Sequence, residues 1–302
     1  DPRGAQRVTP APAGKEDMRR LRLYLELVRF EHTLFALPFA YGGMLLAAGG
    51  WPGWPTFLLV TLAMVGARTM AMALNRLIDW RLDALNPRTQ NRHLPRGLVK
   101  PGETLTLALL GLLLLVYAGL NLNPLTARLL PVAVFFLVFY SYTKRFTWLC
   151  HYVLGLTIGA AAAGGWIAVT GSFAPTAYAL WAGVGLWIAG FDILYATQDY
   201  TFDRAHGVKS IPARFGIPQA LRVARASHLL AWLAFLWAGV SYGAGPLYYL
   251  GLLLVGGLLL LEHRLVSPED LSKVEVAFFQ ANVGVSLGMF LFIVLDLLAR
   301  GA

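Results

Sequence analysis

Long apolar runs fill most of the chain, and short polar stretches separate one run from the next. Each run is roughly 17 to 25 residues long, the length that a helix needs to cross the hydrocarbon core of a bilayer. The pattern therefore predicts an all-α, polytopic membrane protein of about nine transmembrane helices. The predicted spans are residues 24–48, 56–79, 102–120, 126–143, 148–170, 176–198, 219–241, 245–262 and 275–298.

The beginning of the chain differs from the apolar remainder. Residues 1–17 are rich in Ala, Pro, Gly and charged residues, and they contain no apolar stretch of the kind found in a secretory signal. We predict a disordered N-terminal tail over 1–17, followed by a single transmembrane domain over 18–302. The composition agrees with such a domain, because 57% of the residues are hydrophobic and the mean hydropathy is +0.60.

The net charge of +9 reflects topology rather than a nucleic-acid partner. Lys and Arg gather in alternate loops, and by the positive-inside rule these loops and the N-terminus face the cytoplasm. The basic loops also favour contact with anionic lipid at the bilayer surface. The expected location is the bacterial inner membrane. The intervening loops, which carry no charge, lie near residues 49–55, 121–125, 171–175 and 242–245.

Three oxygen-bearing side chains end the second predicted span. Asn75, Asp79 and Asp83 recur at intervals of four residues, so they follow one face of a helix. Carboxylate and amide oxygens suit Mg²⁺, and the Arg88 and Arg92 side chains that follow suit a phosphate. The plainer alternative is that these charged residues are interfacial anchors or ion pairs at the end of a membrane helix.

A second acidic pair far downstream favours the metal hypothesis. Asp199 and Asp203 again lie four residues apart at the end of an apolar run, and Asp192 precedes them. Each pair is followed by a loop with a basic residue, an aliphatic residue and a proline, and Lys209 is the basic residue of the second loop. We interpret the two halves as a weak internal repeat. Two acidic pairs on one side of the membrane are suited to two metal ions with a diphosphate between them.

Other polar residues lie within the spans or at their ends. Arg68 is in the middle of the second span and needs an acidic partner, for which Asp192 is the natural candidate. This pair is either purely structural or orients a polar substrate. Tyr140 and Lys144 end the fourth span, where they are either interfacial residues or contacts of a diphosphate. Small residues over 155–165 either allow close helix packing or line a tunnel for an apolar chain.

Together these motifs resemble the UbiA superfamily of intramembrane aromatic prenyltransferases, over about residues 20–300. The segments Phe30–Pro38 and Tyr195–Asp203 are most similar to the 4-hydroxybenzoate polyprenyltransferase branch. The resemblance implies nine helices around a central cavity, Mg²⁺ as cofactor and a polyprenyl diphosphate as donor. The motifs that carry it are Asn75-x3-Asp79-x3-Asp83, Asp192-x6-Asp199-x3-Asp203 and Tyr140-x3-Lys144-Arg145.

The resemblance also implies roles for residues of this chain. Arg76 departs from the family pattern, because many members have an acidic residue directly after the asparagine. The catalytic candidates are Asp79, Asp199, Asp192, as a base or orienting group, and Arg68. The expected metal ligands are Asn75, Asp79, Asp83, Asp199 and Asp203. The expected substrate contacts are Asn75, Arg88, Arg92, Tyr140, Lys144 and Lys209.

The expected function is Mg²⁺-dependent transfer of a polyprenyl group to a small aromatic acid in quinone biosynthesis. A 4-hydroxybenzoate acceptor implies ubiquinone-type synthesis, whereas a dihydroxynaphthoate implies menaquinone synthesis. A secondary transporter is the main alternative, although its site is expected at the membrane midplane rather than at one face. The chain lacks the G-x-G-D context that is usual in intramembrane aspartyl proteases. A non-enzymatic membrane scaffold would explain neither acidic pair.

Overall fold

The computed structural model describes residues 13–29 and 33–301. The first three residues of the segment Phe30–Pro38, which resembles the 4-hydroxybenzoate polyprenyltransferase branch, therefore lie outside the described part. Apart from one isolated bridge, the described chain contains helices and no β-structure. Eight of its helical segments are long and apolar enough to cross a membrane, and a shorter apolar helix spans Phe35–Ala48. The prediction of an all-α polytopic membrane protein is confirmed.

The long helices begin where the sequence places proline. Pro101, Pro124, Pro175 and Pro246 each open a helix, and a proline is the second residue of two others. Proline suits this position because the first turn has no use for its missing N–H group. The long helices are α2 (Thr33–Ala48), α3 (Trp54–Ile78), α5 (Pro101–Leu122), α6 (Pro124–Phe139), α7 (Cys150–Thr170), α8 (Pro175–Ala196), α11 (Ile217–Tyr242), α12 (Pro246–Arg264) and α14 (Asn282–Ala299).

Shorter elements extend or connect these helices. Most of them lie at the ends of long helices that the sequence identifies as polar, and they carry the acidic and basic motifs. They are α1 (Ala13–Leu27), α4 (Trp80–Leu85), η2 (Tyr140–Arg145), η3 (Thr197–Asp199), α9 (Tyr200–His206), α10 (Ile211–Phe215), α13 (Val274–Val276) and the π-helical η4 (Ala277–Ala281).

The first predicted span is divided in two. The apolar pattern predicted one helix over 24–48, whereas α1 ends at Leu27 and α2 begins at Thr33. Because α1 begins at Ala13, residues 13–17 of the predicted N-terminal tail are helical; the earlier part of that tail lies outside the described residues.

Arg68 provides the physical reason for this division. Its guanidinium donates to the carbonyl oxygens of Val28 and Arg29, at 3.2 and 3.0 Å, directly after the end of α1. Arg29 itself has a left-handed backbone, with φ of 47°. A cation bound to the last carbonyl groups of a helix compensates for the hydrogen bonds that end there. The chain can therefore leave the helix inside the protein.

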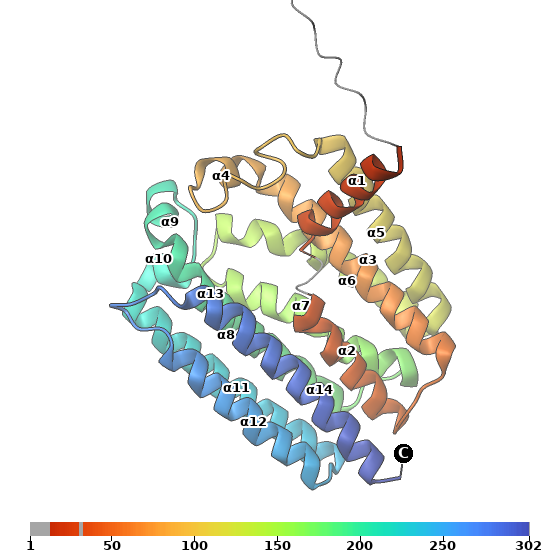
Figure 1. Ribbon diagram of the computed structural model, residues 1–302. Helices are drawn as coiled ribbons and strands as arrows, with labels where there is room; N and C mark the ends of the chain where they lie inside the picture. Colours follow the sequence, from red (N-terminus) through yellow and green to blue (C-terminus); the bar gives the residue numbers. More distant parts are fainter. Residues whose placement is uncertain (1–12, 30–32, 302) are drawn as a thin grey trace, which may run out of the picture.

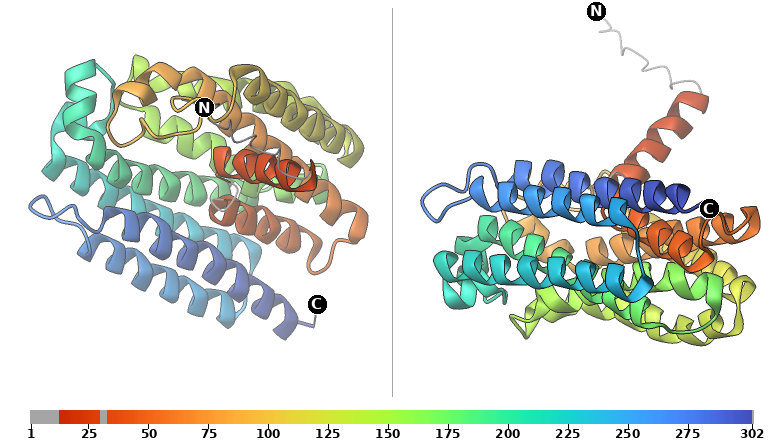
Figure 2. Two further views of the ribbon diagram at one scale, coloured as in Figure 1. Left: turned by 45° about the horizontal axis from the view of Figure 1, so that its top comes forward. Right: turned by 90° about the horizontal axis from the view of Figure 1, so that it is seen from below.

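The long helices run side by side, and α4, α9 and α10 lie at one common end of them, at the upper left of Figure 1. Helices α2, α7, α8, α11, α12 and α14 pack in a closed order, each against the next. A second group, made of α3, α5 and α6, meets the first along α2 and α7 (Figures 1 and 2).

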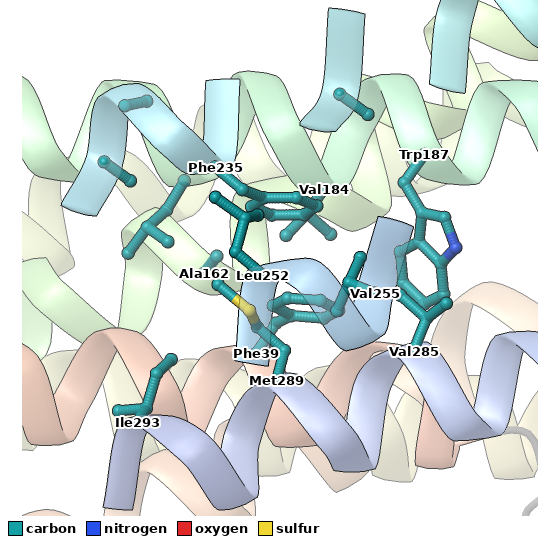
Figure 3. Packing of buried hydrophobic residues seen from close by; sticks show 14 of the residues in the cluster. Phe39, Ala162, Val184, Trp187, Phe235, Leu252, Val255, Val285, Met289 and Ile293 are labelled. Atoms are coloured by element: carbon teal, nitrogen blue, oxygen red, sulfur yellow. The ribbon is translucent and has the colours of Figure 1, made fainter. Parts of the chain in front are cut away.

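Aromatic and aliphatic side chains fill the six-helix group, as Figure 3 shows. The ring of Phe39 from α2 stacks on Phe235 from α11, with 5.5 Å between ring centroids, and Trp187 from α8 lies 5.2 Å from Phe39. Met289 of α14 is fully buried among them. The middle of this group is therefore solid packing, and the polar site lies elsewhere.

Glycines bring α7 close to α8. A Cβ atom on Gly155 or Gly159 would meet the backbone of Gly185 in α8. The small residues at these positions thus serve close helix packing, as membrane helices often use them. The close approach also brings the polar beginning of α7 against the polar end of α8.

Candidate active site

The two acidic motifs share one backbone arrangement. Asp79 lies at the break between α3 and α4, with φ of −94° and ψ of 5°. Asp199 lies at the break between η3 and α9, with φ of −100° and ψ of 12°. These angles fall in the sparsely populated bridge region, which turns the chain away from the axis of the long helix. Asp83 and Asp203 follow in the first turns of the short helices, so the sequence repeat has a structural counterpart.

Both motifs line one cavity of about 220 Å³ at the common end of the long helices. Arg68 is the one predicted site residue that is not part of the lining. The predicted residues that do line it are Asn75, Asp79, Asp83, Arg88, Arg92, Tyr140, Lys144, Asp192, Asp199, Asp203 and Lys209.

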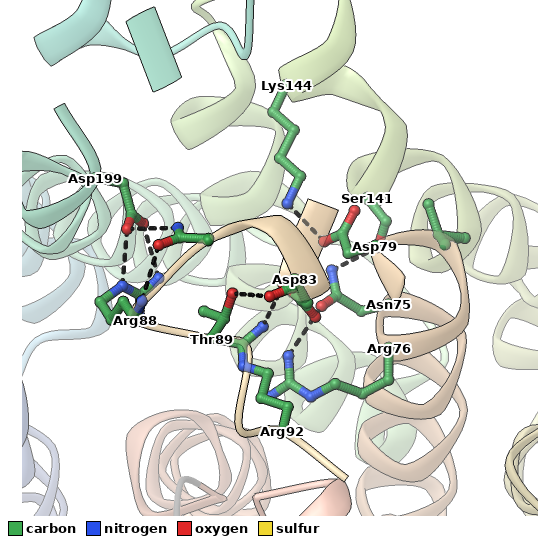
Figure 4. A network of polar contacts seen from close by, with 12 residues as sticks. Asn75, Arg76, Asp79, Asp83, Arg88, Thr89, Arg92, Ser141, Lys144 and Asp199 are labelled. Carbon is green, nitrogen blue, oxygen red and sulfur yellow. Dashed lines mark hydrogen bonds and ion pairs between the residues drawn. The ribbon is translucent and has the colours of Figure 1, made fainter. Parts of the chain in front are cut away.

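Asp79 is buried and bound to the basic end of η2. The Lys144 ammonium lies 2.5 Å from Asp79 Oδ2 (Figure 4). The Arg145 guanidinium lies 3.5 Å from Oδ1 and donates to the Ile78 carbonyl at 2.7 Å. Only 1% of Asp79 is exposed, so Lys144 and Arg145 neutralise a carboxylate that water barely reaches.

Only one of the two carboxylate oxygens of Asp83 has a hydrogen-bond partner in the described chain. Its Oδ1 atom accepts from Arg92 at 3.0 Å, and its backbone carbonyl accepts from the Thr89 hydroxyl at 2.9 Å. Its Oδ2 atom is buried and has no hydrogen-bond partner among the described residues. A buried carboxylate oxygen without a partner is costly, and here it faces a site rich in other oxygen donors.

Asp199 is held by the loop that follows the first motif, residues 86–100, which we call the first loop. Arg88 grips both carboxylate oxygens, with Nε 2.8 Å from Oδ1 and Nη2 2.7 Å from Oδ2 (Figure 4). The Asn86 amide donates to Oδ1 at 3.0 Å. Burial tends to lower the pKa of the Arg88 guanidinium, but the hydrogen bond to Asp199 and the charge interactions with Tyr195 and Asp199 raise that pKa above its usual value.

Two further contacts complete this clamp. Arg88 donates to the Tyr195 hydroxyl at 2.9 Å, and its guanidinium carbon lies 4.9 Å from the centroid of the Tyr195 ring. Asp203, by contrast, takes part in no ion pair within the described chain, although it is buried. The first loop therefore reaches across to the second motif but secures only one of its two carboxylates.

Asn75 is bonded on both sides. Its amide nitrogen donates to the Ser141 hydroxyl at 3.0 Å, and its oxygen accepts from Arg76 at 3.2 Å. Arg76 is 5% exposed, so the residue that departs from the family pattern is buried at the site itself. The nearby Tyr140 hydroxyl points to the carbonyl of Ala71, at 3.5 Å.

The predicted ion pair between Arg68 and Asp192 is wrong. Asp192 Oδ2 lies 2.6 Å from Nδ1 of His151, the second residue of α7. Seven residues do bring Arg68 onto the face of Asn75, but they also separate the two by about 10 Å along the helix. At that depth the carbonyl groups of Val28 and Arg29, directly after α1, bind Arg68 instead.

Several lining residues are not among those predicted from the sequence. Tyr195 carries a readable signal, because it lies three residues after Asp192 and four before Asp199 on the same helical face. Asn86 and His151 carry none, since their roles depend on how a loop and a separate helix fold onto the motifs. The other missed lining residues are Arg76, Leu82, Thr89, Ser141, Cys150, Leu154, Ala196, Phe202, Val208 and Ser210.

The charges that line the cavity balance one another. Five carboxylates and five cationic side chains give a formal charge of zero. The acids are Asp79, Asp83, Asp192, Asp199 and Asp203, and the bases are Arg76, Arg88, Arg92, Lys144 and Lys209. Three of these carboxylates are paired with Arg or Lys side chains. No group of three His, Cys, Asp or Glu side chains in the described chain is arranged to hold a metal ion.

Residues 36–292 match the model of the UbiA prenyltransferase family. The chain belongs to this family. The match includes both acidic motifs, η2 and the beginning of α7, and it confirms the resemblance that the sequence motifs indicated. The protein is accordingly a membrane-bound prenyltransferase of the UbiA family.

Curated relatives agree with the branch that the sequence indicated. The chain is 29% identical over 280 residues to the 4-hydroxybenzoate octaprenyltransferase of Vibrio vulnificus (strain CMCP6), covering 91% of this chain and 98% of the relative. It is 32% identical over 293 residues to the protein of the same name from Nitrosospira multiformis, covering 94% and 98%. Similarity to these relatives extends over nearly the whole of both chains.

Solved structures share the fold. The apo structure of a UbiA homolog from Aeropyrum pernix K1 superposes with a TM-score of 0.80 at 33% identity, covering 88% of this chain and 98% of that one. A UbiA homolog from Archaeoglobus fulgidus, bound to GPP and Mg²⁺, superposes with a TM-score of 0.63 at 19% identity, covering 88% and 99%. The second likeness concerns the fold alone.

Proposed function

We propose that this UbiA-family protein transfers a polyprenyl group from a polyprenyl diphosphate to 4-hydroxybenzoate. The observation that carries the proposal is the convergence of two acidic motifs and five cations on one cavity at the end of a membrane helix bundle. The names of the curated relatives favour 4-hydroxybenzoate over a dihydroxynaphthoate as acceptor. The corresponding pathway is ubiquinone-type biosynthesis.

The residues present fit Mg²⁺ by their chemistry. Carboxylate and amide oxygens are the ligands that this ion prefers. The buried Asp83 Oδ2 atom has no hydrogen-bond partner in the described part of the chain, and a cation would supply one. Bound Mg²⁺ neutralises negative charge on the diphosphate. The proposed ligands are Asn75, Asp79 and Asp83 from the first motif and Asp199 and Asp203 from the second.

The basic side chains have a second use in this proposal. Arg88, Arg92 and Lys144 point at the carboxylates from around the cavity, and Lys209 lies on its rim. When the donor binds, these groups exchange a carboxylate for the diphosphate oxygens. Arg88 is well suited, because its planar fork already makes two parallel hydrogen bonds to an oxyanion.

The reaction then balances without a further reactant. The C–O bond of the allylic diphosphate breaks, and the electron pair leaves with the diphosphate, whose growing charge the cations stabilise. A C–C bond forms between the allylic carbon and the aromatic ring, and the ring proton passes to a base. We assign Asp192 as this base or orienting group, because its carboxylate lines the cavity and is 28% exposed.

Water must be excluded from the cavity during the lifetime of the allylic cation, because water would react with the cation in place of the aromatic acceptor. The first loop lines the cavity from one half of the protein, and the segment after α9 lines it from the other. We further propose that this end of the protein faces the cytoplasm of a bacterial inner membrane, since the basic loops gather there.

The transporter alternative is less well supported. A transporter needs a path between the two sides of the membrane. Phe39, Trp187 and Phe235 fill the middle of the six-helix group instead. The acidic motifs also lie together at one end of the helices rather than at their middle (Figure 1).

Prenyl transfer by purified protein in detergent tests the proposal. A polyprenyl diphosphate is supplied with either 4-hydroxybenzoate or 1,4-dihydroxy-6-naphthoate, with Mg²⁺ or with a chelator. We expect prenylated 4-hydroxybenzoate only in the tube with Mg²⁺. Product from the naphthoate alone would move the protein to menaquinone synthesis, and intact diphosphate in every tube would refute the proposed activity.

A further inference from the structure

His151 lies between the cavity and the segment that follows α9. It is the second residue of α7 and is 2% exposed. Its Nδ1 atom lies 2.6 Å from Asp192 Oδ2, and its Nε2 atom lies 3.1 Å from the backbone nitrogen of Ile211. Both ring nitrogens therefore have partners, on opposite sides of the ring.

These two partners determine where the ring proton lies. The backbone N–H of Ile211 can only donate, so Nε2 of His151 must be the unprotonated acceptor. The proton of a neutral imidazole is then on Nδ1, where it is donated to Asp192. A doubly protonated ring would direct a second N–H at the N–H of Ile211. The geometry thus specifies a neutral ring that donates to a carboxylate, in the manner of histidines oriented by a neighbouring group.

The backbone partner is itself firmly held. The Lys209 N–H donates to the Lys144 carbonyl at 2.6 Å, and the Cys150 thiol lies 3.5 Å from the Lys209 carbonyl. Ile211 is 1% exposed and belongs to a packed cluster with Leu194 of α8. The position of Ile211 is therefore fixed by η2, α7 and α8 together, and His151 transmits that position to Asp192.

We propose that His151 is a positioning residue for prenyl transfer: it occupies Oδ2 of Asp192 and so fixes the remaining carboxylate oxygen toward the aromatic acceptor in the cavity. The proposal rests on the proposed function and on the role given there to Asp192. A group that orients a reacting residue affects the chemical step more than the binding of a remote substrate. Loss of His151 should therefore lower kcat and leave KM for the prenyl diphosphate unchanged.

Three variants separate this role from a structural one. His151→Leu keeps the volume but removes both hydrogen bonds, and we expect kcat to fall about 10- to 100-fold, the usual cost of losing an orienting hydrogen bond. His151→Gln offers a neutral donor and an acceptor, and we expect it to recover most of the loss. The control, Tyr152→Phe, removes a hydrogen bond of 2.7 Å to Ser227 from the next residue of α7 and should leave kcat unchanged.

A double mutant tests the route through Asp192. If His151 acts on Asp192, His151→Leu should cost no further activity in an Asp192→Asn background, because the carboxylate to be oriented is gone. A full additional loss there would overturn the proposal. It would also be overturned by near-normal kcat in His151→Leu, or by equal losses in the Leu and Gln variants.

A spectroscopic measurement keeps the inference testable apart from turnover. Nitrogen-15 NMR of histidine-labelled protein in detergent distinguishes the two neutral tautomers and the charged ring, and the His151→Gln spectrum assigns the signal. We expect a neutral ring protonated at Nδ1. A charged ring, or a proton on Nε2, would contradict the proposal even if wild-type protein failed to prenylate any acceptor. Failure of the proposed function would instead show as inactive wild-type protein with the expected tautomer.

Discussion

The two acidic motifs are alike in backbone and different in support. Asp79 and Asp199 occupy nearly the same backbone angles, and each begins a short helix that carries a second carboxylate. The first motif is neutralised by nearby residues of its own half, namely Lys144 and Arg92. Asp199 is neutralised by Arg88, which comes from the first loop.

Because of this difference, the two halves of the internal repeat do not form a symmetric site. The first loop serves both motifs, because Arg92 turns back to Asp83 while Arg88 crosses to Asp199. The corresponding basic residue of the second half, Lys209, forms no ion pair with the first motif within the described chain. The first loop therefore supplies an ion pair to each of the two motifs.

The largest expected effect tests whether the two motifs are equally necessary. We expect Asp79→Asn and Asp199→Asn each to lower kcat at least about 100-fold. Each substitution removes a carboxylate that is proposed to bind Mg²⁺, and the positive charge of Mg²⁺ would stabilise the departing diphosphate. Asp270→Asn, at an exposed position between α12 and α13, is the matched control. Elution as a single species in detergent shows that the variants fold. Strong loss in only one of the two variants would mean that one motif suffices for the metal.

A smaller effect separates the crossing arginine from the local one. Arg88→Lys keeps the charge but loses the two-pronged contact to Asp199, so we expect kcat/KM for the diphosphate to fall about tenfold. Arg92 makes a single bond to Asp83, and Arg92→Lys should cost only about threefold. Steady-state kinetics with varied donor measures both. Equal losses would remove the distinction between the first loop's two roles.

A third prediction concerns competition between cations at the first motif. Lys144 occupies an oxygen of Asp79, so Lys144→Met should tighten Mg²⁺ binding several-fold while turnover falls. The rise in thermal midpoint with MgCl₂, at constant ionic strength, reports the affinity. Arg88→Met, made for the second motif, should behave in the same way. Weaker Mg²⁺ binding in Lys144→Met would show that the lysine helps to build the metal site.

The smallest effect is confined to stability. Gly97 in the first loop and Gly207 after α9 have φ of 71° and 69°, and neither has a neighbour that an added Cβ would touch. Replacing either by alanine should therefore cost about 1 kcal/mol through backbone strain alone. Gly102→Ala, in the first turn of α5, is the control and should be neutral or stabilising. Unequal losses, measured as shifts in thermal midpoint, would show that one turn is stabilised by contacts.

The spacing of the motifs predicted the acidic residues of the candidate site because spacing along a helix is a local property. Residues four apart on a helix remain neighbours whatever the fold, so the acids of each motif could be grouped from the sequence alone. That the end of α3 lies near the end of α8 could be predicted only from the internal repeat and from the distribution of charge among the loops. These signals placed Lys144 and both motifs correctly on one cavity.

The errors arose where a contact depends on a break in a helix. The apolar run over 24–48 gives no sign that α1 stops at Leu27, so nothing in it shows that carbonyl groups become available to Arg68. With Arg68 bound there, Asp192 is left to His151, whose role depends on the close packing of α7 on α8. Helical periodicity predicts which face a residue occupies, but it does not predict its partner.

The balance of charge around the cavity makes the binding of metal and the binding of the diphosphate donor depend on each other. A cavity whose lining has zero net charge offers little electrostatic attraction to a polyanion or a metal cation alone, whereas the two bound together keep the cavity close to neutral. Each should therefore raise the affinity for the other, and linkage requires the two enhancements to be equal. The protein would then admit its donor as an ion-paired salt, and a metal titration repeated at rising donor concentration should move to lower metal concentration.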